Sequence, residues 1–199
     1  MADYDQQSYW RRRFETETSF EWLMPSDGFM NLMQPHISHL DASSRILHLG
    51  FGTSDLQNHF RARGLVDVTN VDYEPLAVER GRDLERQRFG DVRMRYAVGD
   101  VTQLGAGNPG EYGSYDLVVD KSTSDAVACA GEIPLRRMAD AIRGRLAPGG
   151  IWIALSFSQD RFTIPNLPFH VDIIARVPTP KRLPNDPDIY HWCYLLRPA

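Results

Sequence analysis

The feature that most constrains this chain is a glycine turn between a strand-like run and a helix-like segment. Residues 45–49 read Arg-Ile-Leu-His-Leu and are typical of a buried strand, Gly50 and Gly52 end that run, and residues 54–63 have helical spacing. The same alternation recurs, with strands expected at 67–71, 93–98, 115–119 and 151–157 and helices at 75–89 and 134–146. This alternation predicts an α/β fold with a mostly parallel, doubly wound sheet.

The length of the chain, 199 residues, is typical of one domain. Residues 4–14 and 28–40 have helical patterning and precede the first expected strand. We therefore expect a single domain over 1–199, in which 1–40 form a helical cap over the site and 45–199 form the core.

The second half of the chain carries two further signals. A loop is expected at 105–114, which contains four glycines and Pro109. The last two expected strands, 170–177 and 190–196, are joined by a proline-rich connection with no room for a full helix. Such a connection predicts an antiparallel hairpin at one edge of the sheet.

Composition argues against several classes of protein. The formal net charge is −4, which argues against a dedicated nucleic-acid-binding domain. Cys129 and Cys193 stand far apart, so neither a disulfide framework nor a metal site is expected, and a reducing, cytoplasmic compartment is favoured. Residues 1–7 lack the apolar run of a secretory signal, and no apolar stretch is long enough to cross a bilayer.

Residues at the ends of three successive strands predict a nucleoside-binding crevice. Gly50 and Gly52 allow a ligand to approach the backbone closely, and the following helix presents free N–H groups. Asp72 closes the second strand 22 residues after Gly50, where a carboxylate commonly accepts hydrogen bonds from ribose hydroxyls. Asp100 ends the third strand, where it can accept a hydrogen bond from the exocyclic amine of adenine.

Acidic residues around the turn distinguish between two cofactors. A dinucleotide-binding turn has a third glycine beside the pyrophosphate, whereas this chain has Asp55 there, and its charge would repel a phosphate. The sulfonium of S-adenosylmethionine is positive and would suit a crevice expected to contain Asp55, Asp72, Asp100 and Asp120. S-adenosylmethionine is therefore the expected cofactor, with S-adenosylhomocysteine as product, and a dehydrogenase is the disfavoured reading.

Four segments carry a resemblance to a known family. They are Tyr9-Trp10 with Arg13-Phe14, Leu49 to Ser54, Val71-Asp72-Tyr73, and Asp120 to Ala126. With them the chain resembles the class I, seven-stranded S-adenosylmethionine-dependent methyltransferases from Tyr9 to Leu196. More narrowly, it is similar to the branch that includes lysine methyltransferases of the elongation factor carrying aminoacyl-tRNA. The resemblance implies a Rossmann-like, doubly wound sheet of seven strands, mostly parallel with an antiparallel C-terminal hairpin.

The resemblance also implies roles for residues at the nucleoside end of the site. Asp72 would bind the ribose and Tyr73 would flank the adenine. Asp100 and Val101 would meet the adenine from the next strand. Thr53, in the glycine turn, is included among the cofactor-binding residues.

Other residues are implied at the methionine end. Gly50 and Gly52 would line the methionine and ribose, and Asp120 would lie near the methionine. Trp10 and Arg13 would help to close over the cofactor. The chain departs from the pattern of the branch at four positions near where an acceptor would approach, and these are Phe51, Thr53, Ser122 and Ser124.

The expected function is S-adenosylmethionine-dependent methylation of a protein amine, either a lysine or an N-terminus. A small-molecule methyltransferase, acting on a natural product or metabolite, is the alternative favoured by the short segment between Asp125 and Leu146. A non-catalytic S-adenosylmethionine-binding scaffold is the third reading. No catalytic residue is assigned, because positioning and a dry cavity account for most of the rate in such a displacement.

Overall fold

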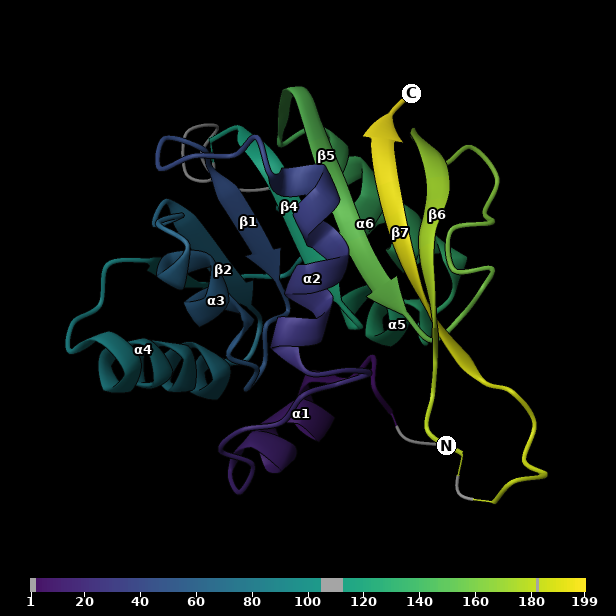
Figure 1. Cartoon of the computed structure of the whole chain (residues 1–199), viewed down its shortest axis with the longest axis horizontal. Helices are drawn as coiled ribbons and strands as arrows, with labels where there is room; N and C mark the ends of the chain where they lie inside the picture. The colour runs from purple at the N-terminus through teal and green to yellow at the C-terminus, as the bar shows by residue number, and fades with distance from the viewer. Residues whose placement is uncertain (1–2, 105–112, 182) are drawn as a thin grey trace.

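Seven strands form one mixed sheet in the computed structural model, which describes residues 3–104, 113–181 and 183–199 (Figure 1). The order is β3-β2-β1-β4-β5-β7-β6. The predicted Rossmann-like, doubly wound sheet is therefore confirmed. The strands are β1 (Ile46–Leu49), β2 (Val68–Asp72), β3 (Arg95–Val98), β4 (Tyr115–Lys121), β5 (Leu146–Ser156), β6 (Phe169–Pro178) and β7 (Tyr190–Pro198).

The first five strands run parallel, and β7 runs antiparallel to both of its neighbours, β5 and β6. The predicted C-terminal hairpin is thus confirmed, with β6 at the edge. Every residue of β1 and β2 is buried, because helices cover both faces of the sheet. In β1 this double burial goes with a mostly apolar sequence, whereas β2 buries Thr69, Asn70 and Asp72 as well as its two valines. Most of the predicted loop at 105–114 lies outside the described residues.

The described residues contain six helices, which are α1 (Gln7–Phe14), α2 (Ser26–Ile37), α3 (Leu56–Ala62), α4 (Pro75–Phe89), α5 (Thr123–Ala128) and α6 (Glu132–Arg143). Apolar side chains of α2, α3 and α4 share one buried cluster with the sheet, and α6 contributes to a second cluster. α1 lies beyond the carboxyl ends of the strands, whereas α2 packs on the sheet (Figure 1). Of the predicted N-terminal cap, α2 therefore belongs to the core. Within the described ranges, no helix has both the length and the apolar character to span a membrane.

Two local elements differ from the sequence-based expectation. The short helix α5 was not predicted, because its six residues are too few to show helical periodicity. The strand expected at 151–157 begins earlier, because residues 146–150 already belong to β5, in which Leu146 pairs with Tyr115. The register shifts before Ile151 pairs with Leu117, and Gly149 has a φ of 79°. The glycines therefore accommodate an irregularity in the strand rather than a turn before it.

Candidate functional site

A cavity of about 590 Å³ lies at the carboxyl ends of the parallel strands. Its walls come from the β1–α3 turn, the ends of β2 and β3, the β4–α5 region and the N-terminal segment around Trp10 and Trp22. The predicted residues that line it are Trp10, Gly50, Gly52, Asp72, Tyr73, Asp100 and Val101. Arg13, Thr53 and Asp120 are not among the described residues that form its walls.

Gly50 brings two walls of the cavity into contact. Its φ is 54°, in the left-handed region that favours glycine. A Cβ at this position would lie 2.3 Å from Oγ1 of Thr123, the first residue of α5. The Thr123 hydroxyl instead donates to the backbone carbonyl of Leu49 at 2.9 Å. The absence of a side chain at Gly50 therefore allows α5 to pack directly on the turn.

Asp72 is the central polar group of the nucleoside end. Its carboxylate accepts the N–H of Gly52 at 2.9 Å and the N–H of Glu74 at 2.9 Å. Burial raises the pKa of Asp72 to about 6, although these hydrogen bonds favour the charged form. A carboxylate has about four lone-pair positions, so Asp72 can also accept from the two hydroxyls of a ribose.

Asp100 and Val101 lie beside Asp72 at the end of β3. The Asp100 carboxylate accepts the N–H and the hydroxyl of Thr102, at 2.8 and 2.7 Å. The N–H of Gly99 donates to the carbonyl of Asp72 at 2.9 Å, which ties the two strand ends together. The structure thus brings together the ribose-binding and adenine-binding positions expected from the sequence.

Aromatic residues of the N-terminal segment form the cover of the cavity. The Trp10 indole N–H donates to the carbonyl of Tyr4 at 2.7 Å, and the Trp10 ring contacts those of Phe14 and Trp22. Arg13 contacts this aromatic cluster and is not among the described residues that line the cavity. Its guanidinium bonds to Glu17 at 2.5 Å and lies over the ring of Trp22.

Thr53 and Asp120 have structural partners. The Thr53 hydroxyl donates to Glu17 at 2.8 Å. The buried Asp120 carboxylate accepts the backbone N–H groups of Thr123 and Ser124, at 2.6 and 3.1 Å, and burial raises its pKa to about 6. Asp120 therefore holds the start of α5 at the edge of the cavity.

The acidic surroundings of the cavity differ in part from the expected set. Asp55 lies outside the described lining and its carboxylate stands 3.5 Å from Nε2 of His59. Asp5 and Asp125 line the cavity instead. Both were missed because their positions depend on contacts between distant parts of the chain.

Lys121 is a cavity residue that the sequence reasoning missed. Its ammonium group contacts the Glu21 carboxylate and donates to the carbonyl of Met24 at 3.2 Å. Burial lowers the pKa of Lys121 to about 7. Its position directly after Asp120, at the end of a buried strand, is the sequence signal that identifies it.

His48, also in the cavity wall, is held by the side chain of Asn70. Its Nδ1 lies 3.1 Å from Oδ1 of Asn70. Burial lowers the pKa of His48 to about 4, so the ring is neutral near pH 7.

The end of the cavity opposite the nucleoside positions is built around Asp125. Its carboxylate accepts from Nε of Arg161 at 2.7 Å and from the N–H of Phe157 at 3.1 Å. The Phe157 ring is 55% exposed and packs beneath the Arg161 guanidinium. Ser122, in the same wall, has a φ of 71°, a strained value for a residue with a side chain. This end offers the aromatic face of Phe157 to an acceptor.

Comparison with known proteins identifies the family. A protein of Neurospora crassa named methyltransferase srdJ is 56% identical over 199 residues, which are all of this chain and 85% of that protein. The chain is a class I S-adenosylmethionine-dependent methyltransferase. This methyltransferase matches no protein-family model.

More distant relatives of this methyltransferase have named protein targets. EEF1A lysine methyltransferase 4 of Bos taurus is 29% identical over 173 residues, which are 80% of this chain and 64% of that protein. The human citrate synthase-lysine N-methyltransferase is 31% identical over 132 residues, 60% of this chain and 54% of that protein. This methyltransferase therefore spans less than two thirds of the length of either relative.

Solved structures agree on the fold. The N-methyltransferase NodS of Bradyrhizobium japonicum, in complex with S-adenosylhomocysteine, superposes with a TM-score of 0.64 at 16% identity, covering 94% of this chain and 98% of that one. TrmN of Thermus thermophilus superposes with a TM-score of 0.68 at 14% identity, covering 95% of this chain and 53% of that one. At these identities the likeness supports the architecture alone.

Proposed function

We propose that this methyltransferase binds S-adenosylmethionine across the ends of β1, β2 and β4 and methylates a protein amine, either a lysine or an N-terminus. The observation that carries the proposal is the division of one cavity into two chemically different ends. Asp72 and Asp100 supply carboxylates at the nucleoside end, whereas the opposite end presents the ring of Phe157 beside the Asp125–Arg161 ion pair, and Asp5 lines the same cavity.

The residues of the cavity fit the proposed cofactor. Asp72 has free lone pairs for the ribose hydroxyls, and Asp100 with Val101 borders the space for adenine. The Lys121 ammonium has three hydrogens, of which Glu21 and Met24 account for two among the described contacts. The third is available for the carboxylate of the methionine part.

When bound, S-adenosylmethionine supplies a methyl carbon already activated by a positive sulfur. The chain has to position the acceptor and exclude water, and effective positioning contributes on the order of 7–11 kcal/mol in good cases. Trp22 and Phe157 present rings, and Asp5 presents a carboxylate, that attract an amine and orient it. We assign no side chain as the base that receives the proton of the amine.

A small-molecule acceptor is the second candidate. It is supported by the apolar wall near α5, where Val127, Ala130 and Pro134 line the cavity. A protein acceptor is preferred because named relatives act on lysines of eEF1A and citrate synthase. A non-catalytic scaffold is disfavoured because Gly50, Asp72 and Asp100 are retained in a connected site.

The deciding experiment incubates the protein with S-adenosylmethionine labelled in the methyl group, a cell lysate and a metabolite extract. Label in a protein band that yields methyl-lysine or an N-methylated terminus on hydrolysis supports the proposal. Label in a small-molecule fraction supports the alternative. Binding of S-adenosylhomocysteine without any transfer supports the scaffold. The same mixture without the protein is the control, and label that appears there comes from another enzyme.

We also propose a cytoplasmic location. The support is that both thiols are free, Cys193 in the core and Cys129 at the cavity, which suits a reducing compartment. The proposed partner is the methyl acceptor itself. Nucleic acid is disfavoured by the net charge of −4.

A further inference from the structure

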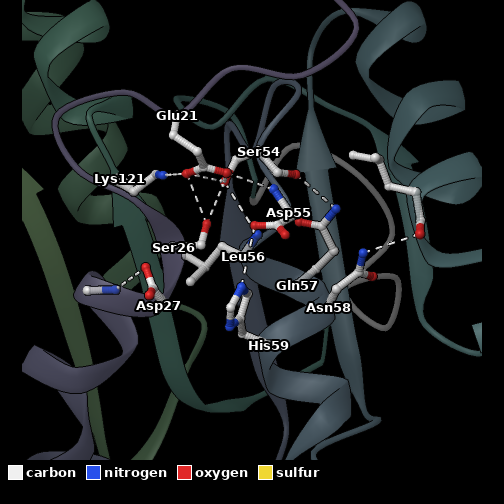
Figure 2. Close-up of polar contacts among 12 residues, drawn as sticks. Glu21, Ser26, Asp27, Ser54, Asp55, Leu56, Gln57, Asn58, His59 and Lys121 are labelled. Atoms are coloured by element: carbon white, nitrogen blue, oxygen red, sulfur yellow. Dashed lines mark hydrogen bonds and ion pairs between the residues drawn. The ribbon is translucent and has the colours of Figure 1, made fainter. Parts of the chain in front are cut away.

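Glu21 joins three parts of the chain through a single carboxylate (Figure 2). It accepts the hydroxyl of Ser26, at the start of α2, at 2.9 Å. It accepts the hydroxyl of Ser54 at 2.9 Å and the N–H of Asp55 at 3.0 Å, both in the β1–α3 turn. It also contacts the ammonium group of Lys121 at the end of β4. The carboxylate thus links the N-terminal segment to the two strand ends that border the cavity.

These four donors occupy the hydrogen-bonding capacity of the carboxylate, which has about four lone-pair positions. Glu21 is also outside the described lining of the cavity. It therefore has neither the free lone pair of a general base nor the access of a ligand-binding group. Its effect on the site has to pass through the groups that it holds.

Of those groups, Lys121 is the one that reaches the cavity with a charge. The Lys121 side chain is 4% exposed, and a buried ammonium is stable only with a close counter-charge. Glu21 is the acid with which it forms an ion pair among the described residues. Glu21 and the Met24 carbonyl together fix the direction of the ammonium group and leave one hydrogen for a ligand.

We infer that Glu21 is a positioning residue that acts through Lys121 and aims its ammonium group at the carboxylate of the amino-acid part of the cofactor. The inference rests on the proposed placement of the cofactor. It predicts a selective effect, because Lys121 is assigned to the amino-acid part of the cofactor, whereas Asp72 and Asp100 are assigned to its nucleoside part.

The test compares two ligands by titration calorimetry, S-adenosylhomocysteine and 5′-methylthioadenosine. They share the nucleoside and the sulfur, but the second lacks the amino-acid end. Glu21→Gln removes the charge and leaves an amide that can still bond to the serine hydroxyls. We expect this variant to bind S-adenosylhomocysteine about tenfold or more weakly, and to bind 5′-methylthioadenosine less than about twofold more weakly. Lys121→Met should show the same pattern.

Glu17→Gln is the matched control. Glu17 lies in the same segment and bonds to Thr53 of the same turn at 2.8 Å, but its side chain bonds to Thr53 and Arg13 rather than to Lys121. This variant should leave the affinity for both ligands within about twofold of the unaltered protein. Thermal unfolding of each variant identifies any that is not folded, and Glu21→Asp replaces Glu21→Gln in that case, with an expected selective loss of at least about threefold.

Three results would overturn the inference. They are unchanged affinity in Glu21→Gln, an equal loss for both ligands, and an additive loss when Glu21→Gln is combined with Lys121→Met. An equal loss of affinity for the two ligands would mean that Glu21 stabilises the whole β1–α3 turn rather than acting through Lys121. If the unaltered protein binds neither ligand, the proposed cofactor site fails, and this outcome is distinct from the loss of selectivity alone.

Discussion

The two ends of the cavity are built in different ways. The nucleoside end comes from one stretch of chain, in which Asp72 bonds to Gly52, 20 residues away, and to Glu74, 2 residues away. The opposite end joins distant segments, as shown by the Asp125 carboxylate, which accepts from the N–H of Phe157, 32 residues away, and from Arg161, 36 residues away. The topology of the parallel sheet positions the first end, whereas specific long-range contacts position the second.

Gly50→Ala tests whether the two ends depend on each other, and it should have the largest effect. The new Cβ would collide with Thr123 in addition to adopting a positive φ, so we expect a loss of about 3 kcal/mol or more in the free energy of unfolding. Chemical denaturation measures this loss. Gly64→Ala is the control, because Gly64 has a φ of 81° but open space around a Cβ. Equal losses of unfolding free energy in the two variants would mean that the positive φ alone, and not the collision with Thr123, causes the loss.

Asp72→Ala should impair binding at the nucleoside end of the cavity only. It removes the acceptor of the ribose hydroxyls, so we expect both S-adenosylhomocysteine and 5′-methylthioadenosine to bind at least about tenfold more weakly. Titration calorimetry measures both affinities. Asp55→Ala, outside the described lining, should leave them unchanged. An unchanged affinity in Asp72→Ala would remove Asp72 from the site.

A pH series also tests the role of Asp72 in binding the nucleoside, with a smaller expected change in affinity. Burial raises the pKa of Asp72 from 3.8 to about 6, so the charged carboxylate that accepts from ribose is lost as the pH falls through about 6. We expect affinity for 5′-methylthioadenosine to fall several-fold, roughly three- to tenfold, between pH 7.5 and pH 5. Because the raised pKa means that the folded state disfavours the charge, Asp72 also opposes folding increasingly as the pH rises from about 4 to 6.

Asp72→Asn provides the control for the pH series. Its affinity should be lower at pH 7.5 and nearly independent of pH, since the titrating group is gone. Asp120, which shares a pKa of about 6, remains in this variant and caps α5 outside the described lining of the cavity. A pH dependence that survives in Asp72→Asn would therefore assign the effect to Asp120 or another group.

Ser122→Gly changes only the opposite end and should have the smallest effect. Ser122 has a φ of 71°, and glycine adopts that conformation without strain, so we expect about 1 kcal/mol of added stability. The gain is reduced by loss of the Ser122 hydroxyl, which donates to Asp125 at 3.2 Å. Thermal unfolding measures the change. Ser43→Gly, in an exposed turn, should give no gain, and a destabilised Ser122→Gly would mean that the hydroxyl contact outweighs the strain.

The contrast between the two ends also explains what the sequence could predict. The buried strand β1 is recognisable as a mostly apolar run, and the end of β2 places Asp72 beside the glycine turn. Arg13 has no local signal that separates a cofactor contact from its observed contacts with Glu17 and Trp22. Lys121 was missed because lysine usually faces solvent, and its burial depends on Glu21, which is distant in the sequence.

The position of β7 between β5 and β6 has a consequence for synthesis. Residues 190–198 supply the hydrogen-bonding partner for 152–156 of β5, the part that carries the fully buried Trp152 and Leu155. A growing polypeptide on the ribosome has already made β5 and β6 before β7 exists, so an apolar sheet edge stays open during that interval. Such an edge is prone to pair with other chains. We expect ribosome-bound fragments that stop before residue 190 to recruit chaperones more strongly than those that include β7.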